Sequence, residues 1–125
     1  MKFETLGNAT LQFFRDGQPV LATDPWLKGT CYFGSWALEK PLTDAQIANV
    51  LASDYLWISH GHPDHMHVES LAMLPQGKRV LVPDHYHAEI RDFLVGQSFD
   101  VTVMPYREWI DLGSGMRAMC LDNPN

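Results

Sequence analysis

The sequence has 125 residues, and its 9 Lys and Arg against 15 Asp and Glu give a formal net charge of −6. This length fits one small domain or part of a larger one, and the acidic balance argues against general binding to nucleic acid or to anionic membranes. Hydrophobic residues make up 46% and charged residues 19%, which excludes disorder, and the short apolar runs predict neither a signal peptide nor a membrane span.

The N-terminal third is predicted to consist of strands followed by a long loop. The strands are expected over residues 2–6, 10–15 and 19–23. The Asp16-Gly17 pair favours a hairpin turn between the last two, because Gly tolerates a positive φ. Residues 25–41 then form a long irregular segment, and such loops in compact domains are usually functional or flexible.

The rest of the chain alternates between helices and strands. Thr43 and Gln46 have the spacing of a capping box, so a helix is predicted to begin after Thr43. Residues 54–59 are almost continuously apolar, which suits a strand that is covered on both faces. Further elements are expected as a helix over 68–74, a strand over 79–82, a helix from Asp84 to Gly96, a strand around 101–103 and a hairpin of 109–112 with 116–121. This alternation predicts a sheet covered by helices.

The strongest chemical signal is the segment His60-x-His62-x-Asp64-His65, directly after the apolar strand. Imidazoles and carboxylates are ligands of borderline divalent metals such as zinc. Residues i and i+2 of an extended chain point the same way, so His60 and His62 are predicted to converge on one metal. Asp64 and His65 follow a turn and are available to a second metal. The alternative is a polar turn with surface histidines.

This segment resembles the hallmark of the metallo-β-lactamase superfamily, H-x-H-x-D-H after a buried strand. The resemblance extends to Leu6-Gly7-Asn8-Ala9-Thr10, where the family often has His in place of Asn8. Thr23-Asp24-Pro25-Trp26-Leu27 is similar to the family's first acidic motif. Within the superfamily, Asp-Pro-Trp-Leu followed by a Gly- and Trp-rich loop and by Ile-Ser-His resembles the branch that contains the sialic-acid nucleotide hydroxylases. Sugar-phosphate lactonases and acyl-ethanolamine phospholipases are also similar.

The resemblance implies an α/β fold of the αββα sandwich type. Within it, this chain corresponds to the N-terminal αβ half, with a mixed sheet and helices on one face. The family's site also takes a third His, a bridging Asp and a late His from its second half, and no His follows His87 here. We therefore expect residues 1–125 to be a single, incomplete domain.

The resemblance also implies roles for individual residues. His60 and His62 would hold a first metal, Asp64 and His65 a second, and Asp24 would orient a ligating His through its other ring nitrogen. Zinc is expected, with two ions per complete site, and iron or manganese are alternatives because ligand type does not select among them. The implied activity is hydrolysis by metal-activated water, which Asp64 would also help to orient.

The substrate is expected to be a small molecule, with anionic, sugar-linked and nucleotide-linked compounds all left open. Two other functions compete with hydrolysis. One is iron-dependent oxidation, since the fold also hosts di-iron redox sites. The other is a degenerate domain without catalytic activity that binds metal or ligand.

The remaining candidates carry weaker signals. Trp26, Trp36 and His85 are candidates for lining a substrate pocket. Tyr32 and Phe33 of the same long loop could also line a pocket or a lid, although core packing explains these four loop aromatics equally well. His87 repeats the i, i+2 spacing with His85, but at a predicted helix start, where the two do not share a face. His67 is expected to be exposed near the start of a helix.

The two cysteines, Cys31 and Cys120, lie far apart and in no metal-type spacing. They are expected to be small packing residues in a reducing compartment, which we take to be the cytoplasm. Association with a second copy is left open, because an exposed face of a half-sandwich would favour it.

Overall fold

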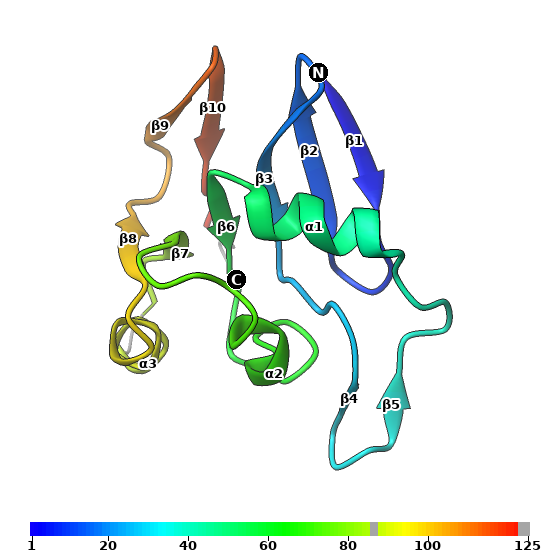
Figure 1. Ribbon diagram of the computed structural model, residues 1–125. Coiled ribbons are helices and arrows are strands. Elements are labelled where there is room, and N and C mark those ends of the chain that lie inside the picture. Colours follow the sequence, from blue (N-terminus) through cyan, green and yellow to red (C-terminus); the bar gives the residue numbers. More distant parts are fainter. Residues whose placement is uncertain (86–87, 123–125) are drawn as a thin grey trace.

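The computed structural model describes residues 1–85 and 88–122 and follows the predicted order of elements. A short hairpin, β4–β5, additionally forms within the long loop, and it projects beyond the sheet past α2 (Figure 1). The strands are β1 Lys2–Thr5, β2 Leu11–Arg15, β3 Gln18–Thr23, β4 Thr30–Cys31, β5 Trp36–Ala37, β6 Tyr55–Trp57, β7 Arg79–Pro83, β8 Asp100–Met104, β9 Trp109–Gly113 and β10 Met116–Met119. The helices are α1 Asp44–Ala52, α2 Val68–Leu71 and α3 Glu89–Gly96.

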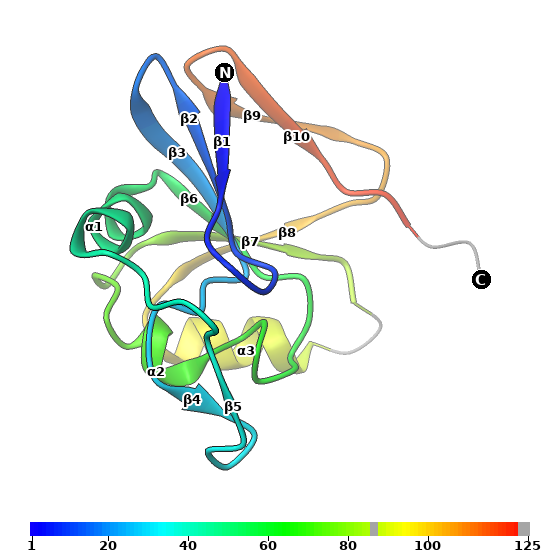
Figure 2. The same cartoon turned by 90° about the vertical axis from the view of Figure 1, so that its right-hand side faces the viewer.

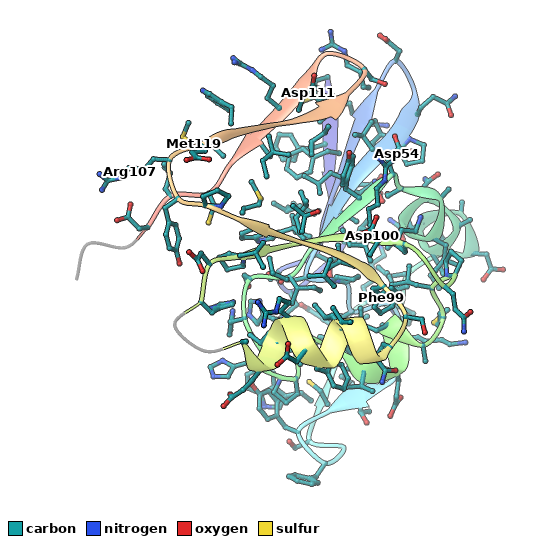
Figure 3. The ribbon with its side chains drawn as sticks, turned by 90° about the vertical axis from the view of Figure 1, so that its left-hand side faces the viewer. Asp54, Phe99, Asp100, Arg107, Asp111 and Met119 are labelled. Carbon is teal, nitrogen blue, oxygen red and sulfur yellow. The ribbon has the colours of Figure 1, made fainter. Side chains whose placement is uncertain are left out.

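The main sheet has six strands in the order β1-β2-β3-β6-β7-β8. β1, β2 and β3 pair antiparallel, whereas β3, β6, β7 and β8 pair parallel, so the sheet is mixed as expected. In Figure 3, Asp54 before β6 and Asp100 at the start of β8 lie on the same side of the view. The carboxyl ends of the parallel strands therefore open at one common edge, where ligands bind in sheets of this kind.

The two faces of the sheet are covered differently. Figure 2 shows the three helices on one side and the β9–β10 hairpin on the other. On the helical side, Leu56 and Val80 belong to a buried cluster with Val50 of α1 and Leu94 of α3. The opposite cluster contains Val20, Leu81 and Met104 of the sheet with Leu112 and Met116 of the hairpin. The expected placement of the helices on one face is confirmed.

The predicted capping box is present at the start of α1. The backbone N–H of Gln46 donates to Thr43 Oγ1 over 3.1 Å, and the N–H of Thr43 donates to Gln46 Oε1 over 2.9 Å. Both bonds satisfy amide groups that the first helical turn leaves without partners. In the described part of the chain, no helix is long and apolar enough to cross a membrane.

The prediction that α3 begins near Asp84 is wrong, since the helix begins at Glu89 with Ala88 as its N-cap. The N–H of His85 donates to the carbonyl of Pro83 over 2.9 Å. This tight turn at the end of β7 occupies the position where the helix was predicted to begin. His87 lies outside the described residues.

The helix predicted over 68–74 is shorter than expected. Its α-helical part ends at Leu71. Beyond it, the N–H of Met73 donates to Ser70 O and that of Leu74 to Leu71 O, over 3.0 and 3.1 Å. These i to i+3 bonds tighten the last turn, as is common where a helix ends.

Candidate metal centre

The candidate site lies where β3 and β6 end side by side. Ile58, directly after β6, is fully buried, and its N–H donates to Leu81 O over 3.0 Å. The N–H of Asp24, directly after β3, donates to Trp57 O over 2.7 Å. These bonds extend the strand pairing to the start of the histidine segment, which therefore begins on a rigid element.

His60 and His62 form a first pair of nitrogen donors. His60 Nε2 lies 3.1 Å from His62 Nδ1, with the ring planes at 79°. Two nitrogens that bind one zinc ion tetrahedrally, each at about 2.0–2.1 Å, are about 3.3 Å apart. The two imidazoles thus have the separation that a shared ion requires.

Asp64 and His65 form a second pair beside the first. Asp64 Oδ2 lies 3.4 Å from His65 Nε2, which again suits two ligands of one ion at about 2.0–2.2 Å. The rings of His60 and His65 are 4.1 Å apart between centroids, so the two pairs are neighbours. The structure therefore brings together all four residues predicted as ligands.

Asp24 and Ser59 form a hydrogen-bonded unit behind these donors. Asp24 is 5% exposed, and its Oδ1 accepts the Ser59 N–H over 2.7 Å. Its Oδ2 accepts the Ser59 hydroxyl over 2.8 Å and lies 3.0 Å from His65 Nδ1. Because this carboxylate can only accept when ionised, His65 carries its proton on Nδ1, and the Nε2 lone pair faces Asp64.

The hydrogen bonds of Ser59 likewise determine the tautomer of His60. The single hydroxyl proton of Ser59 goes to Asp24, so the serine oxygen must accept from His60 Nδ1, which lies 2.8 Å away. The lone pair of His60 Nε2 then faces His62. Burial, together with His65 and His62, lowers the pKa of His60, which favours the neutral form that a metal ligand requires.

Two further side chains hold Asp64, which is 7% exposed. Asn8 Nδ2 donates to both its Oδ2 and its backbone carbonyl over 3.1 Å, and the Tyr32 hydroxyl donates to its Oδ1 over 2.9 Å. Burial raises the pKa of Asp64, but the bonds from Asn8 and Tyr32 outweigh it and the pKa lies below its usual value. The bond to Asp64 also raises the pKa of Tyr32, which keeps the phenol a donor.

The sequence pattern did not identify Tyr32 as a partner of Asp64. The residue was visible only as one aromatic of the long loop, and the path of an irregular loop leaves no periodic signal. Asn8 was detectable through its place in the opening glycine turn.

The prediction that His67 is exposed is wrong. His67 is 3% exposed and is the N-cap of α2. Its Nδ1 lies 2.7 Å from Ser70 Oγ and its Nε2 lies 2.8 Å from the carbonyl of Thr30 in β4. It is buried because the long loop folds back over α2, which a reading of neighbouring residues alone does not reveal.

The pocket candidates are placed in different surroundings. A cavity of about 730 Å³ is lined mainly by residues 5–8 and 35–43, including Trp36, together with Trp26 and Gln46. Asn8 lines it and also binds Asp64, so the cavity borders the candidate centre. Trp26 is 2% exposed and packs on His67, whereas Trp36 is 49% exposed. His85 lines a separate cavity of about 230 Å³ beside α3.

Within residues 1–85 and 88–122, no three His, Cys, Asp or Glu side chains are grouped so as to hold one ion together. The donors instead form two pairs, and each pair supplies two of the four ligands that a tetrahedral zinc ion takes. The remaining positions would be filled by other ligands, water or substrate. The donor types, their separations and the directions of their lone pairs fit divalent metal ions.

The fold is that of the metallo-β-lactamase-like hydrolases. An isothiocyanate hydrolase from Delia radicum gut bacteria superposes with a TM-score of 0.63 at 21% identity, over 94% of this chain and 46% of that chain. A "possible metal-dependent hydrolase" from Veillonella parvula gives a TM-score of 0.61 at 19% identity, over 84% of this chain and 42% of its own. At these identities the likeness defines the fold.

No family model matches the sequence. Curated relatives include the cytidine monophosphate-N-acetylneuraminic acid hydroxylases of Danio rerio, 30% identical, and of Gorilla gorilla gorilla, 29% identical, each over 112 residues. These matches cover 84% of this chain but 19% and 18% of the two relatives. The chain thus spans about a fifth of the length of these relatives.

Proposed function

We propose that this chain carries part of the active site of a metal-dependent hydrolase of small molecules. The observation that carries the proposal is the arrangement of the four donors in two pairs, with the lone pairs of His60 and His65 directed at their partners. His60 and His62 would hold a first metal, and Asp64 and His65 a second. Zinc is the default ion, and iron or manganese fit the same donors.

The protein's own residues have distinct parts in this proposal. A bound divalent ion would supply an acidified water molecule and would polarise the substrate. Asp24 fixes the ring and the tautomer of His65, and Ser59 does the same for His60. Asp64 is ionised and buried, so its oxygens can orient a water molecule by accepting a hydrogen bond.

The adjoining cavity is the proposed substrate pocket. It is lined by Asn8, which donates to Asp64, and its half-exposed Trp36 offers an apolar wall. Its lining contains one acidic residue, Glu39, and one cationic residue, Lys40. This mixed lining suits a small substrate with both apolar and polar parts. The solved proteins of the same fold, named as hydrolases, support the reaction class.

The test is hydrolysis by the full-length protein after loading with zinc, manganese or iron. We expect turnover of lactone, phosphodiester, nucleotide-sugar or isothiocyanate substrates that a chelator abolishes and added metal restores. Asp64→Asn should lower kcat/KM by about 10²-fold or more, since it removes a ligand and an acceptor together. Turnover that resists both the chelator and Asp64→Asn would contradict the proposal.

The hydroxylase relatives favour one second candidate, an iron-dependent oxidation. In that case the purified protein should contain iron, show a visible absorption band and consume oxygen with its substrate. A protein that binds metal but turns over no substrate would instead support a non-catalytic binding domain.

A further inference from the structure

The β4–β5 hairpin reaches the candidate metal centre through the side chain of Tyr32. Its hydroxyl donates to Asp64 Oδ1 over 2.9 Å, whereas Asp64 Oδ2 is the oxygen that lies 3.4 Å from His65 Nε2. The two carboxylate oxygens therefore have different partners. The donor on Oδ1, together with Asn8 Nδ2 on Oδ2, selects one rotation of the carboxylate, in which Oδ2 is directed to the side where His65 lies.

Tyr32 is held in an unusual backbone conformation. It has a φ of 52° and is followed by Phe33 at 57°, a left-handed pair that bulky residues rarely adopt. The backbone N–H and the hydroxyl of Ser35 donate to the Tyr32 carbonyl over 3.1 and 2.6 Å, and the Tyr32 ring lies 4.6 Å from that of Trp36. Such strain persists where the surroundings over-determine it and clusters at functional sites.

The base of the hairpin is anchored on the other side of the histidine segment. The Thr30 carbonyl lies 2.8 Å from His67 Nε2, and His67 is itself buried. The hairpin is thus attached at two points, Thr30 to His67 and Tyr32 to Asp64. These two attachments fix the position of the phenol relative to the carboxylate.

We propose that Tyr32 is a positioning residue for Asp64, whose hydroxyl holds Oδ1 so that Oδ2 is presented to the second metal. This inference rests on the proposed function, because it assigns Asp64 to a metal. It adds that the hairpin affects the binding of the second metal ion through Asp64 and does not affect binding by the His60 and His62 pair.

The test compares Tyr32→Phe with wild type in the full-length protein by titration with Co²⁺, followed by calorimetry and by the visible spectrum. Tyr32→Phe keeps the ring and its packing on Trp36 and removes one hydroxyl. We expect binding of the second Co²⁺ equivalent to weaken by about 10–100-fold with an altered spectrum, whereas the first equivalent is unchanged. Tyr106→Phe removes a phenol outside the centre and is the matched control, which should titrate as wild type does.

The outcomes separate this inference from the function on which it rests. If wild type and Tyr32→Phe bind two equivalents with equal affinities and spectra, the positioning role is refuted and the metal site stands. If wild type binds no Co²⁺, the proposed function fails and this inference with it. Near-UV circular dichroism checks that each variant is folded. Trp36→Phe weakens the packing on the Tyr32 ring but keeps the Tyr32 hydroxyl. This variant should therefore lose less affinity for the second Co²⁺ equivalent than Tyr32→Phe does, and none for the first.

Discussion

At the scale of single residues, Asp24 organises the site more than any proposed ligand does. Its two oxygens accept from the backbone and the hydroxyl of Ser59 and from His65 Nδ1. One buried carboxylate thereby fixes the proton positions of His60 and His65. Histidines without such a partner would be free to present either ring nitrogen, so the proposed metal site depends on a residue that is not itself a proposed ligand.

Asp24→Asn tests this dependence. An amide cannot accept at both ends, so we expect metal affinity to fall by about 10–100-fold and the free energy of unfolding to fall by about 1–3 kcal/mol. Asp16→Asn is the matched control, because Asp16 also has a left-handed φ, 50° against 39° for Asp24, but is exposed in a turn. Equal metal affinity in both variants would contradict the role given to Asp24.

At the scale of elements, the long loop packs against the short helix α2 and forms hydrogen bonds with it. Its N-cap His67 contacts Thr30 of β4, and Ser70 Oγ accepts the N–H of Leu27 over 2.8 Å. Trp26 packs on the His67 ring with 5.6 Å between centroids. The loop over residues 25–41 is therefore attached to α2 by hydrogen bonds, even though most of it lacks regular structure.

His67→Ala should lower the free energy of unfolding by about 2–4 kcal/mol, because it removes a helix cap and leaves the Thr30 carbonyl without its partner. Urea unfolding of the full-length protein measures this. His67→Asn keeps an acceptor for the cap but is too short to reach Thr30, and it should recover about 1 kcal/mol. A cost below about 0.5 kcal/mol for the alanine variant would show that the loop does not depend on this contact.

Elements with a local signal could be predicted from the sequence, and those set by distant contacts could not. The capping box located α1, and the apolar run of residues 54–59 located β6. By contrast, a turn at Pro83 displaced the start of α3, and the fold of the loop buried His67. In the candidate site, the four proposed ligands were visible as a motif, whereas the contact from Tyr32 depends on a loop conformation that no pattern specifies.

At the scale of the whole molecule, the main sheet has a hydrophobic cluster on each face, and different elements pack on the two faces. The helical side holds the larger cluster, and the opposite side is closed by the β9–β10 hairpin, where Cys120 is buried. Burial and, to a smaller extent, the nearby Asp122 raise the pKa of the Cys120 thiol above its usual value. Folding therefore favours the protonated thiol, and the resulting stability is present below the unfolded pKa and is lost as pH rises through the folded pKa.

This linkage predicts a pH-dependent difference between wild type and Cys120→Ala. Wild type should be more stable by an amount that stays constant below about pH 8 and shrinks as pH rises further, because the thiol of the unfolded chain, with a pKa of about 8.5, ionises first. Urea unfolding of both proteins from pH 7 to about pH 11 measures the difference. A difference that stays constant over the whole range would show that the thiol titrates alike in both states.

His60, His62, Asp64 and His65 are proposed to hold divalent metal, and the proposed reaction depends on it. The most direct test is the zinc content of the full-length protein after equilibrium dialysis, beside His60→Ala, Asp64→Ala and the control His85→Ala, whose imidazole lies in a separate cavity. We predict that wild type and His85→Ala retain zinc to the same stoichiometry, and that His60→Ala and Asp64→Ala each lose at least one equivalent. Zinc retention by wild type no greater than that of the His60→Ala and Asp64→Ala variants would contradict the account.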